Sequence, residues 1–183
     1  NSSIVRMARE EIVRIQGKGK KVKIFTVGKK SYEQLKRLYG ELIIEQMDLS
    51  ASKTVNFDQA KDIADKVLDM YEAGEFDVAT VFFGRYQSVI AQIPTAAQII
   101  PASPPDTGED AEAAAPYDYE PDEEEILATL LPRYVAVQIF RALLENAASE
   151  QGARLSAMDN ATRNAGAMID QLHLQYNRAR QAP

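Results

Sequence analysis

The chain lacks several residue types on which catalytic and metal sites usually depend. None of its 183 residues is cysteine, which excludes a disulfide framework, a thiolate nucleophile and a cysteine metal site. The only histidine is His173, and because the sequence supplies no partner ligands for it, we expect a surface or seam residue. Neither glycine-rich phosphate-loop pattern, GxGxxG or GxxxxGK(S/T), occurs. We therefore expect no catalytic residue, no cofactor and no metal site.

Long apolar runs are missing as well. No stretch approaches about 18 consecutive apolar residues, so we expect no segment to insert into a membrane. The chain begins at Asn1 with neither a methionine nor the charged and apolar regions of a signal peptide. We interpret it as a chain that lacks its original start.

Charge is distributed unevenly along the chain. The net charge is −6, but residues 101–125 hold ten acidic residues and no basic one, so the remainder carries +4. Residues 14–30 hold seven basic residues and no acidic one. That basic run has two interpretations: it contacts phosphates or an acidic protein surface, or it forms a solvated hairpin whose lysines protect a strand edge from mispairing.

Apolar periodicity predicts alternating helices and strands over the first hundred residues. The predicted elements are a helix over 1–16, a strand over 21–27, a helix over 31–39, a weak strand over 42–47, a helix over 56–73, and strands over 78–83 and 88–100. This order is typical of an α/β fold, here a Rossmann-like three-layer domain with a partly parallel sheet. Asn56 and Gln59 fit a capping box. We expect the strand over 78–83 to be covered on both faces, Gly84 and Arg85 to form a turn, and Pro94 to mark an edge or bulge.

The domain organisation follows from composition. Residues 1–100 are predicted to form an α/β globular foot, 101–121 an acidic proline-rich linker, and 122–183 a long C-terminal helix. Asp122 can cap that helix, and Pro132 is expected to kink or restart it.

The long helix carries a heptad seam, in which apolar or small residues recur in steps of four and three. Only two glycines and no proline interrupt residues 133–180. At about 1.5 Å per residue, a helix of this length extends well beyond any compact domain that the chain could build. The predicted seam consists of Leu144, Ala148, Gln151, Leu155, Met158, Thr162, Ala165, Ile169, Leu172 and Tyr176.

Residues 149–165, SEQGARLSAMDNATRNA, resemble the gamma subunit of F-type ATP synthases, and the similarity continues to Ala182. Weaker similarity extends over the lysine-rich residues before Gly28, residues 78–86, 93–95 and 119–121, so it covers essentially the whole chain. Gamma subunits continue beyond both ends of this chain, with a long N-terminal helix and strand before it and further helix after it. The resemblance therefore implies a truncated gamma subunit.

The resemblance implies a mechanical function. The chain would be the central-stalk rotor subunit, with no catalysis of its own, that couples rotation of the membrane ion-translocating ring to conformational changes in the catalytic hexamer. The long helix would form half of an antiparallel coiled coil. Implied partners are the alpha and beta subunits of the hexamer, an epsilon or equivalent subunit and the membrane rotor ring, with no nucleic acid. The implied location is peripheral, on the cytoplasmic face of the bacterial inner membrane or the inner face of an organelle membrane.

Individual residue roles also follow from the resemblance. Arg180 and Gln181 match a pair that contacts the catalytic ring. Tyr119, Glu120 and Asp122 match the part of the foot that meets the rotor ring and the epsilon subunit. Gly152 is expected to keep the seam narrow, so that two helices can approach.

Two other functions are compatible with the pattern. A free-standing α/β head with a coiled-coil stalk would act as an interaction adaptor and would self-associate through the seam. A small nucleotide-binding enzyme would need a phosphate loop after its first strand, and Gly28-Lys29-Lys30 does not provide one.

Overall fold

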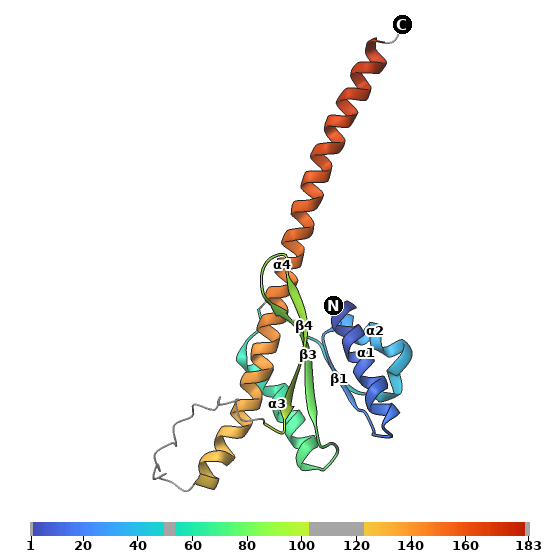
Figure 1. Ribbon diagram of the computed structural model, residues 1–183. Coiled ribbons are helices and arrows are strands. Elements are labelled where there is room, and N and C mark those ends of the chain that lie inside the picture. The colour runs from blue at the N-terminus through green and yellow to red at the C-terminus, as the bar shows by residue number, and fades with distance from the viewer. Residues whose placement is uncertain (1, 50–53, 103–122, 182–183) are drawn as a thin grey trace, which may run out of the picture.

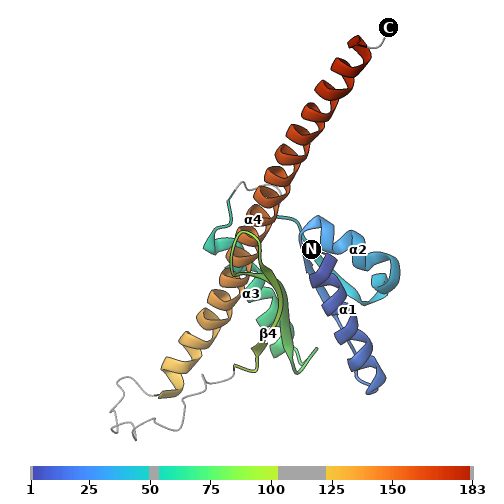
Figure 2. The ribbon, with the colours of Figure 1, turned by 45° about the horizontal axis from the view of Figure 1, so that its top comes forward.

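The computed structural model describes residues 2–49, 54–102 and 123–181. It consists of an α/β foot from which one helix projects far beyond every other element, as both ribbon views show (Figure 1 and Figure 2). The elements are α1 (Ser2–Gly17), β1 (Ile24–Val27), α2 (Lys29–Tyr39), the short 3-10 helix η1 (Gly40–Leu42), β2 (Ile43–Met47), α3 (Phe57–Glu72), β3 (Ala79–Tyr86), β4 (Gln92–Ile100) and α4 (Glu123–Gln181).

The strands form two separate two-stranded sheets. β1 pairs with β2 in parallel, and β3 pairs with β4 antiparallel. Helices α1 and α2 contact these strands, and α3 and α4 pack together against β3 and β4. The expected three-layer α/β fold with partly parallel pairing is therefore confirmed, but as two sheets instead of one.

Two strand predictions are wrong in detail. Gly84 and Arg85 do not form a turn, because β3 runs through them to Tyr86 in register with β4. The expected burial of β3 on both faces is also not found, since Thr80 is exposed. Pairing with β4 extends the strand past Gly84, and such pairing is not visible in local residue preferences.

Local sequence determines both ends of helix α3. The Asn56 side chain accepts a hydrogen bond from the Gln59 backbone N–H, and the Gln59 side chain accepts one from the Asn56 N–H, which confirms the capping box. At the other end Gly74 has φ +70°, and the Glu75 N–H donates to Met70 O at 3.0 Å. Glycine adopts this left-handed conformation without steric penalty, so the chain turns away from the helix here.

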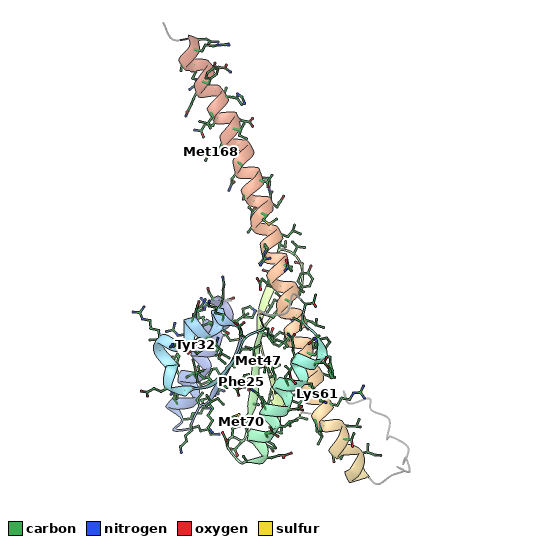
Figure 3. All side chains as sticks on the ribbon, turned by 180° about the vertical axis from the view of Figure 1, so that it is seen from behind. Phe25, Tyr32, Met47, Lys61, Met70 and Met168 are labelled. Carbon is green, nitrogen blue, oxygen red and sulfur yellow. The ribbon has the colours of Figure 1, made fainter. Side chains whose placement is uncertain are left out.

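The core lies where α3, β4 and α4 meet. Its buried members are Ala60, Ile63, Ala64, Ile99, Ile100, Val135, Ala136 and Ile139. Phe25 and Met47 pack against this cluster from the parallel sheet, whereas Met168 stands on the projecting part of α4, far from the foot (Figure 3). A long helix is thus anchored by one segment only.

Helix α4 has 59 residues and continues through Pro132. The restart expected at Pro132 is therefore not found, and the bend expected there stays a prediction. Between residues 123 and 181 the helix supplies both the anchor in the foot and the whole of the projection.

Candidate functional site

One side of α4 is buried against the foot. Val135 and Ile139 are 4% and 5% exposed, and Ala142 and Ser149 continue the same side toward the projection. At about 100° per residue, the nine residues from Val135 to Leu144 correspond to about two and a half turns. Leu144 therefore lies on the side of α4 opposite the foot.

The opposite side carries the predicted seam, and all ten of its residues are exposed. The large apolar members remain about half accessible or more: Leu144 44%, Leu155 55%, Met158 57%, Ile169 54%, Leu172 56% and Tyr176 65%. A row of this length that is mostly apolar, interrupted by Gln151 and Thr162, is unusual on a protein surface and indicates a contact surface. Its spacing in steps of four and three is that of a helix that packs along another helix.

The seam is longer than the sequence prediction. Counting back from Leu144 in the same steps reaches Arg141, Val137, Tyr134 and Leu130. Val137 is 44% exposed, Tyr134 39% and Leu130 50%, so this part also faces away from the foot. Periodicity alone could have found these residues, but next to a globular foot such apolar positions would ordinarily be assigned to its core. Their exposed fractions place them outside the core, because a different row of α4 residues fills that core.

Among the described residues, one helix is apolar enough to cross a membrane by length and composition alone. It is Ile126–Gln181, with mean hydropathy 1.4 over its most apolar 18 residues, of which 22% are buried. Part of the apolar residues of this segment lie in the buried row and part in the seam, and others, such as Met168 and Leu174, are exposed outside both. That no segment inserts into a membrane stays a prediction.

The other predicted contact residues are placed unevenly. Arg180 and Gln181 lie in the last turn of α4 and are exposed, at the end farthest from the foot. Tyr119, Glu120 and Asp122 lie outside the described residues.

The prediction for Gly152 is wrong. Gly152 is buried on the side of α4 that faces β3, where an added Cβ would lie 3.1 Å from the Tyr86 ring. Its small size therefore allows close approach to a strand of the foot, not to a partner helix in the seam. Spacing alone did not distinguish these sides, because Gly152 is adjacent to the seam residue Gln151.

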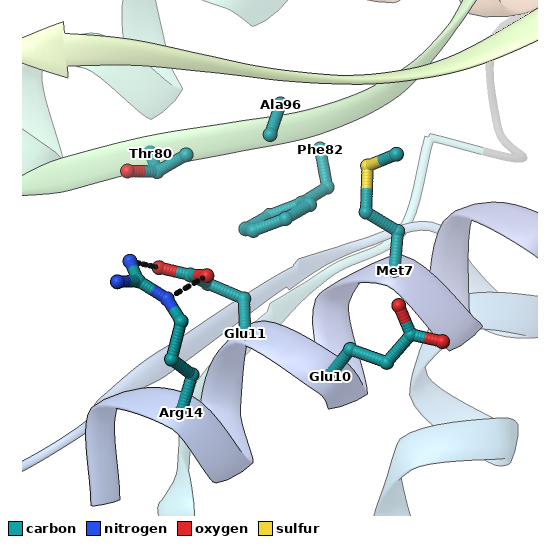
Figure 4. A pocket seen from close by; sticks show the side chains of 7 residues that line it. All are labelled: Met7, Glu10, Glu11, Arg14, Thr80, Phe82 and Ala96. Atoms are coloured by element: carbon teal, nitrogen blue, oxygen red, sulfur yellow. Dashed lines mark hydrogen bonds and ion pairs between the residues drawn. The ribbon is translucent and has the colours of Figure 1, made fainter. Parts of the chain in front are cut away.

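A pocket of about 390 Å³ lies between α1 and the antiparallel sheet (Figure 4). Its lining residues are Met7, Glu10, Glu11, Arg14, Thr80, Phe82 and Ala96. The Arg14 Nε donates to Glu11 Oε2 at 2.7 Å, and this hydrogen bond lowers the pKa of Glu11 and raises the pKa of Arg14. Within residues 2–49, 54–102 and 123–181, no three histidine or acidic residues are grouped to hold a metal.

The basic run over residues 14–30 is partly neutralised. Arg14 pairs with Glu11, and Lys23 Nζ lies 2.6 Å from Glu75 Oε2, in the loop after α3. Lys18, Lys20 and Lys21 are exposed in the connection from α1 to β1. This arrangement agrees with the solvated interpretation of the run, and contact with an acidic protein surface stays a prediction.

Comparison with known proteins agrees with this geometry. The sequence profile of the family described as ATP synthase matches residues 1–183. The ATP synthase gamma chain of Paracoccus denitrificans is 60% identical over 184 residues, and that of Dinoroseobacter shibae is 63% identical over 183 residues. Each match covers 100% of this chain and 62% of the relative, so the chain spans less than two thirds of the length of these relatives.

Solved structures support the fold. A chain from the cryo-EM structure of the Tetrahymena thermophila mitochondrial ATP synthase, central stalk and c-ring, superposes with a TM-score of 0.66 at 24% identity. The superposition covers 88% of this chain and 68% of that one. A chain of the Euglena gracilis mitochondrial ATP synthase rotor superposes with a TM-score of 0.59 at 17% identity. The family profile matches the whole length of the chain, and the two relatives named above are gamma chains. This chain therefore belongs to the ATP synthase family.

Proposed function

We propose that the protein is the central-stalk gamma subunit of an F-type ATP synthase. In this function it catalyses no reaction itself. It couples rotation of the ion-translocating ring in the membrane to conformational changes in the catalytic hexamer of alpha and beta subunits. The observation that carries the proposal is the exposed seam on a helix anchored in an α/β foot, in a chain 60% identical to a gamma chain.

The seam is an exposed apolar surface that a partner helix would cover. A helix about 50 residues long with half-exposed leucines along one row would be stabilised by a second helix lying along that row. The relatives are longer than this chain, so a segment of the same subunit is available to supply it. An antiparallel coiled coil stiffens the projection, and a stiff shaft transmits torque.

The contacts at the two ends of the molecule follow from the same proposal. Arg180 and Gln181, exposed at the tip of α4, contact the surrounding catalytic ring. Tyr119, Glu120 and Asp122 contact the rotor ring and the epsilon subunit. Residues 1–100 serve as the foot, 101–121 as a linker and 122–183 as half of the shaft.

The proposed location follows from the partners. The relatives in Paracoccus and Dinoroseobacter are bacterial gamma chains, so we place the protein peripherally on the bacterial inner membrane, at its cytoplasmic face. It is held there by the rotor ring.

The test uses a form of the protein extended to the full length of its relatives. It is co-expressed, with an affinity tag, with the alpha and beta subunits of a related bacterium, and separately with the epsilon subunit. We expect both to co-purify, and we expect Leu155→Glu with Ile169→Glu to reduce assembly because two charges then enter the seam. Failure of both co-purifications refutes the proposal. Dimerisation of the extended protein without binding to the hexamer would support an adaptor instead.

The tip residues have their own test. Replacing Arg180 and Gln181 together with alanine should lower ATP turnover of the assembled complex while the melting temperature of the isolated subunit stays the same. Both side chains are exposed, so replacing them should change the free energy of unfolding of the isolated subunit only slightly. Unchanged turnover would make them ordinary surface residues.

A further inference from the structure

Helix α4 and strand β3 are joined by two hydrogen bonds where the helix leaves the foot, one of them buried and the other partly buried. The Ser149 Oγ donates to Gly84 O at 2.8 Å, and the Gly84 N–H donates to Asn146 Oδ1 at 3.3 Å. Ser149 is only 6% exposed. Gly84 is paired in register with Pro94 of β4, a residue without an N–H. Both backbone groups of one strand residue are thus bonded to side chains of α4.

Two glycines bring the helix and the strand into close contact at this place. A Cβ on Gly84 would lie 3.4 Å from Ser149 Cβ, and a Cβ on Gly152 would lie 3.1 Å from Tyr86 Cε2. At Gly84 the contact with α4 is therefore made by backbone and the short side chains of Ser149 and Asn146, which have few rotamers and little freedom to adjust. Long flexible side chains at the same positions would separate the two elements.

Beyond this contact α4 is almost fully exposed. Gly152 is buried, whereas from residue 153 to residue 181 only Ser156 is even partly covered. The apolar contacts of Val135 and Ile139 hold α4 in the core, but apolar burial is not directional. Hydrogen bonds have strict angular requirements, so the two bonds at Gly84 add a directional restraint on the rotation of α4 about its own axis, which the burial of one side already limits.

We propose that Gly84, Asn146, Ser149 and Gly152 form a joint that locks the rotation of α4 to that of the foot. Ser149 is then a positioning residue for torque transmission, acting through the Gly84 backbone. This inference rests on the proposed function as a rotor shaft. Torque that enters at the foot has to cross this joint before it reaches the projecting segment.

The test measures the torsional stiffness of the rotor in the assembled complex. The catalytic hexamer is fixed to a surface, a bead is attached to the foot of the extended protein, and the angular variance of the bead is recorded while the rotor is stalled. Ser149→Ala removes a hydrogen bond worth about 1 kcal/mol. The population in which α4 is detached from Gly84 should therefore rise about fivefold. We expect a larger angular variance than in the unmodified protein.

Controls separate stiffness from stability. Ser156→Ala removes the same hydroxyl from α4 about two turns beyond Ser149, outside the joint, and should leave the variance unchanged. Ser149→Thr keeps the hydroxyl and should restore the stiffness. If Ser149→Ala does not assemble, Asn146→Ala removes the second bond and carries the same test. Unchanged variance in the assembled joint variant overturns the inference, as does an equal increase in Ser156→Ala.

Failure of the proposed function would look different. If the unmodified protein shows no ATP-driven rotation of the bead, or does not bind the hexamer, the rotor assignment itself is wrong. A complex that rotates, but whose torsional stiffness is unchanged in the Ser149 and Asn146 variants, contradicts the proposed joint and leaves the rotor assignment intact.

Discussion

Leu172 and Leu174 provide a matched pair for testing the seam. They lie two residues apart on α4, with similar exposed fractions of 56% and 60%. Two residues correspond to about 200° around a helix, so the two side chains point to nearly opposite sides. Leu172 belongs to the seam and Leu174 does not. Alanine at either position removes the same atoms from the same helix.

The expected magnitude follows from the exposed fractions. Full burial of a leucine side chain is worth about 1.5–3 kcal/mol, so covering the exposed half of Leu172 contributes about 1–1.5 kcal/mol. Leu172→Ala also leaves a cavity under a partner helix, which brings the expected loss to about 1–2 kcal/mol. In the present chain no partner covers the seam, and the same substitution should change the free energy of unfolding by less than about 0.5 kcal/mol.

The assay is urea unfolding followed by far-UV circular dichroism, on the present chain and on the form extended to the length of its relatives. Leu172→Ala should be nearly neutral in the present chain and destabilising in the extended form. Leu174→Ala should be nearly neutral in both, since no seam partner covers it. Equal losses for the two substitutions in the extended form, or no loss for either, would refute the assignment of the seam.

Three further predictions concern the foot. Asn56→Ala should lower the free energy of unfolding by about 1 kcal/mol in urea titrations, because it removes the α3 capping box, whereas Asn56→Asp retains an acceptor and should not. Ile63→Ala, at a core position 3% exposed, should cost about 2–5 kcal/mol in the same titrations, and a loss below 1 kcal/mol would contradict the packing of α3 on α4. Glu11→Gln should abolish a small pH-dependent part of the stability. Arg14 lowers the pKa of Glu11, so its contribution is present above the ordinary value of 4.5 and is lost as pH falls through the lowered pKa. Thermal melts of both proteins at neutral and at low pH should therefore converge at low pH, and a constant difference would contradict the role of the pair.

The candidate site was predictable as far as it depends on periodicity. The ten seam residues were identified from their spacing because a helix of regular pitch fixes which residues share a side, whatever it packs against. The exposure of the projecting part was predicted from the length of the helix, and periodicity could have traced the seam back to Leu130, but only burial shows which side of α4 the residues beside the foot occupy. Gly152 was assigned to the wrong side for the same reason.

Sequence by itself determined the local features of this protein: the alternation of helices and strands, the capping box at Asn56, the end of α3 at Gly74 and the length of α4. Each of these features depends on residues within a few positions of one another, so interactions between neighbouring residues are sufficient to determine it. Only the tertiary structure decided that the strands form two sheets, that β3 continues through Gly84, and which side of α4 enters the core. Those features depend on contacts between residues such as Gly84 and Ser149, 65 positions apart, whose pairing no local pattern specifies.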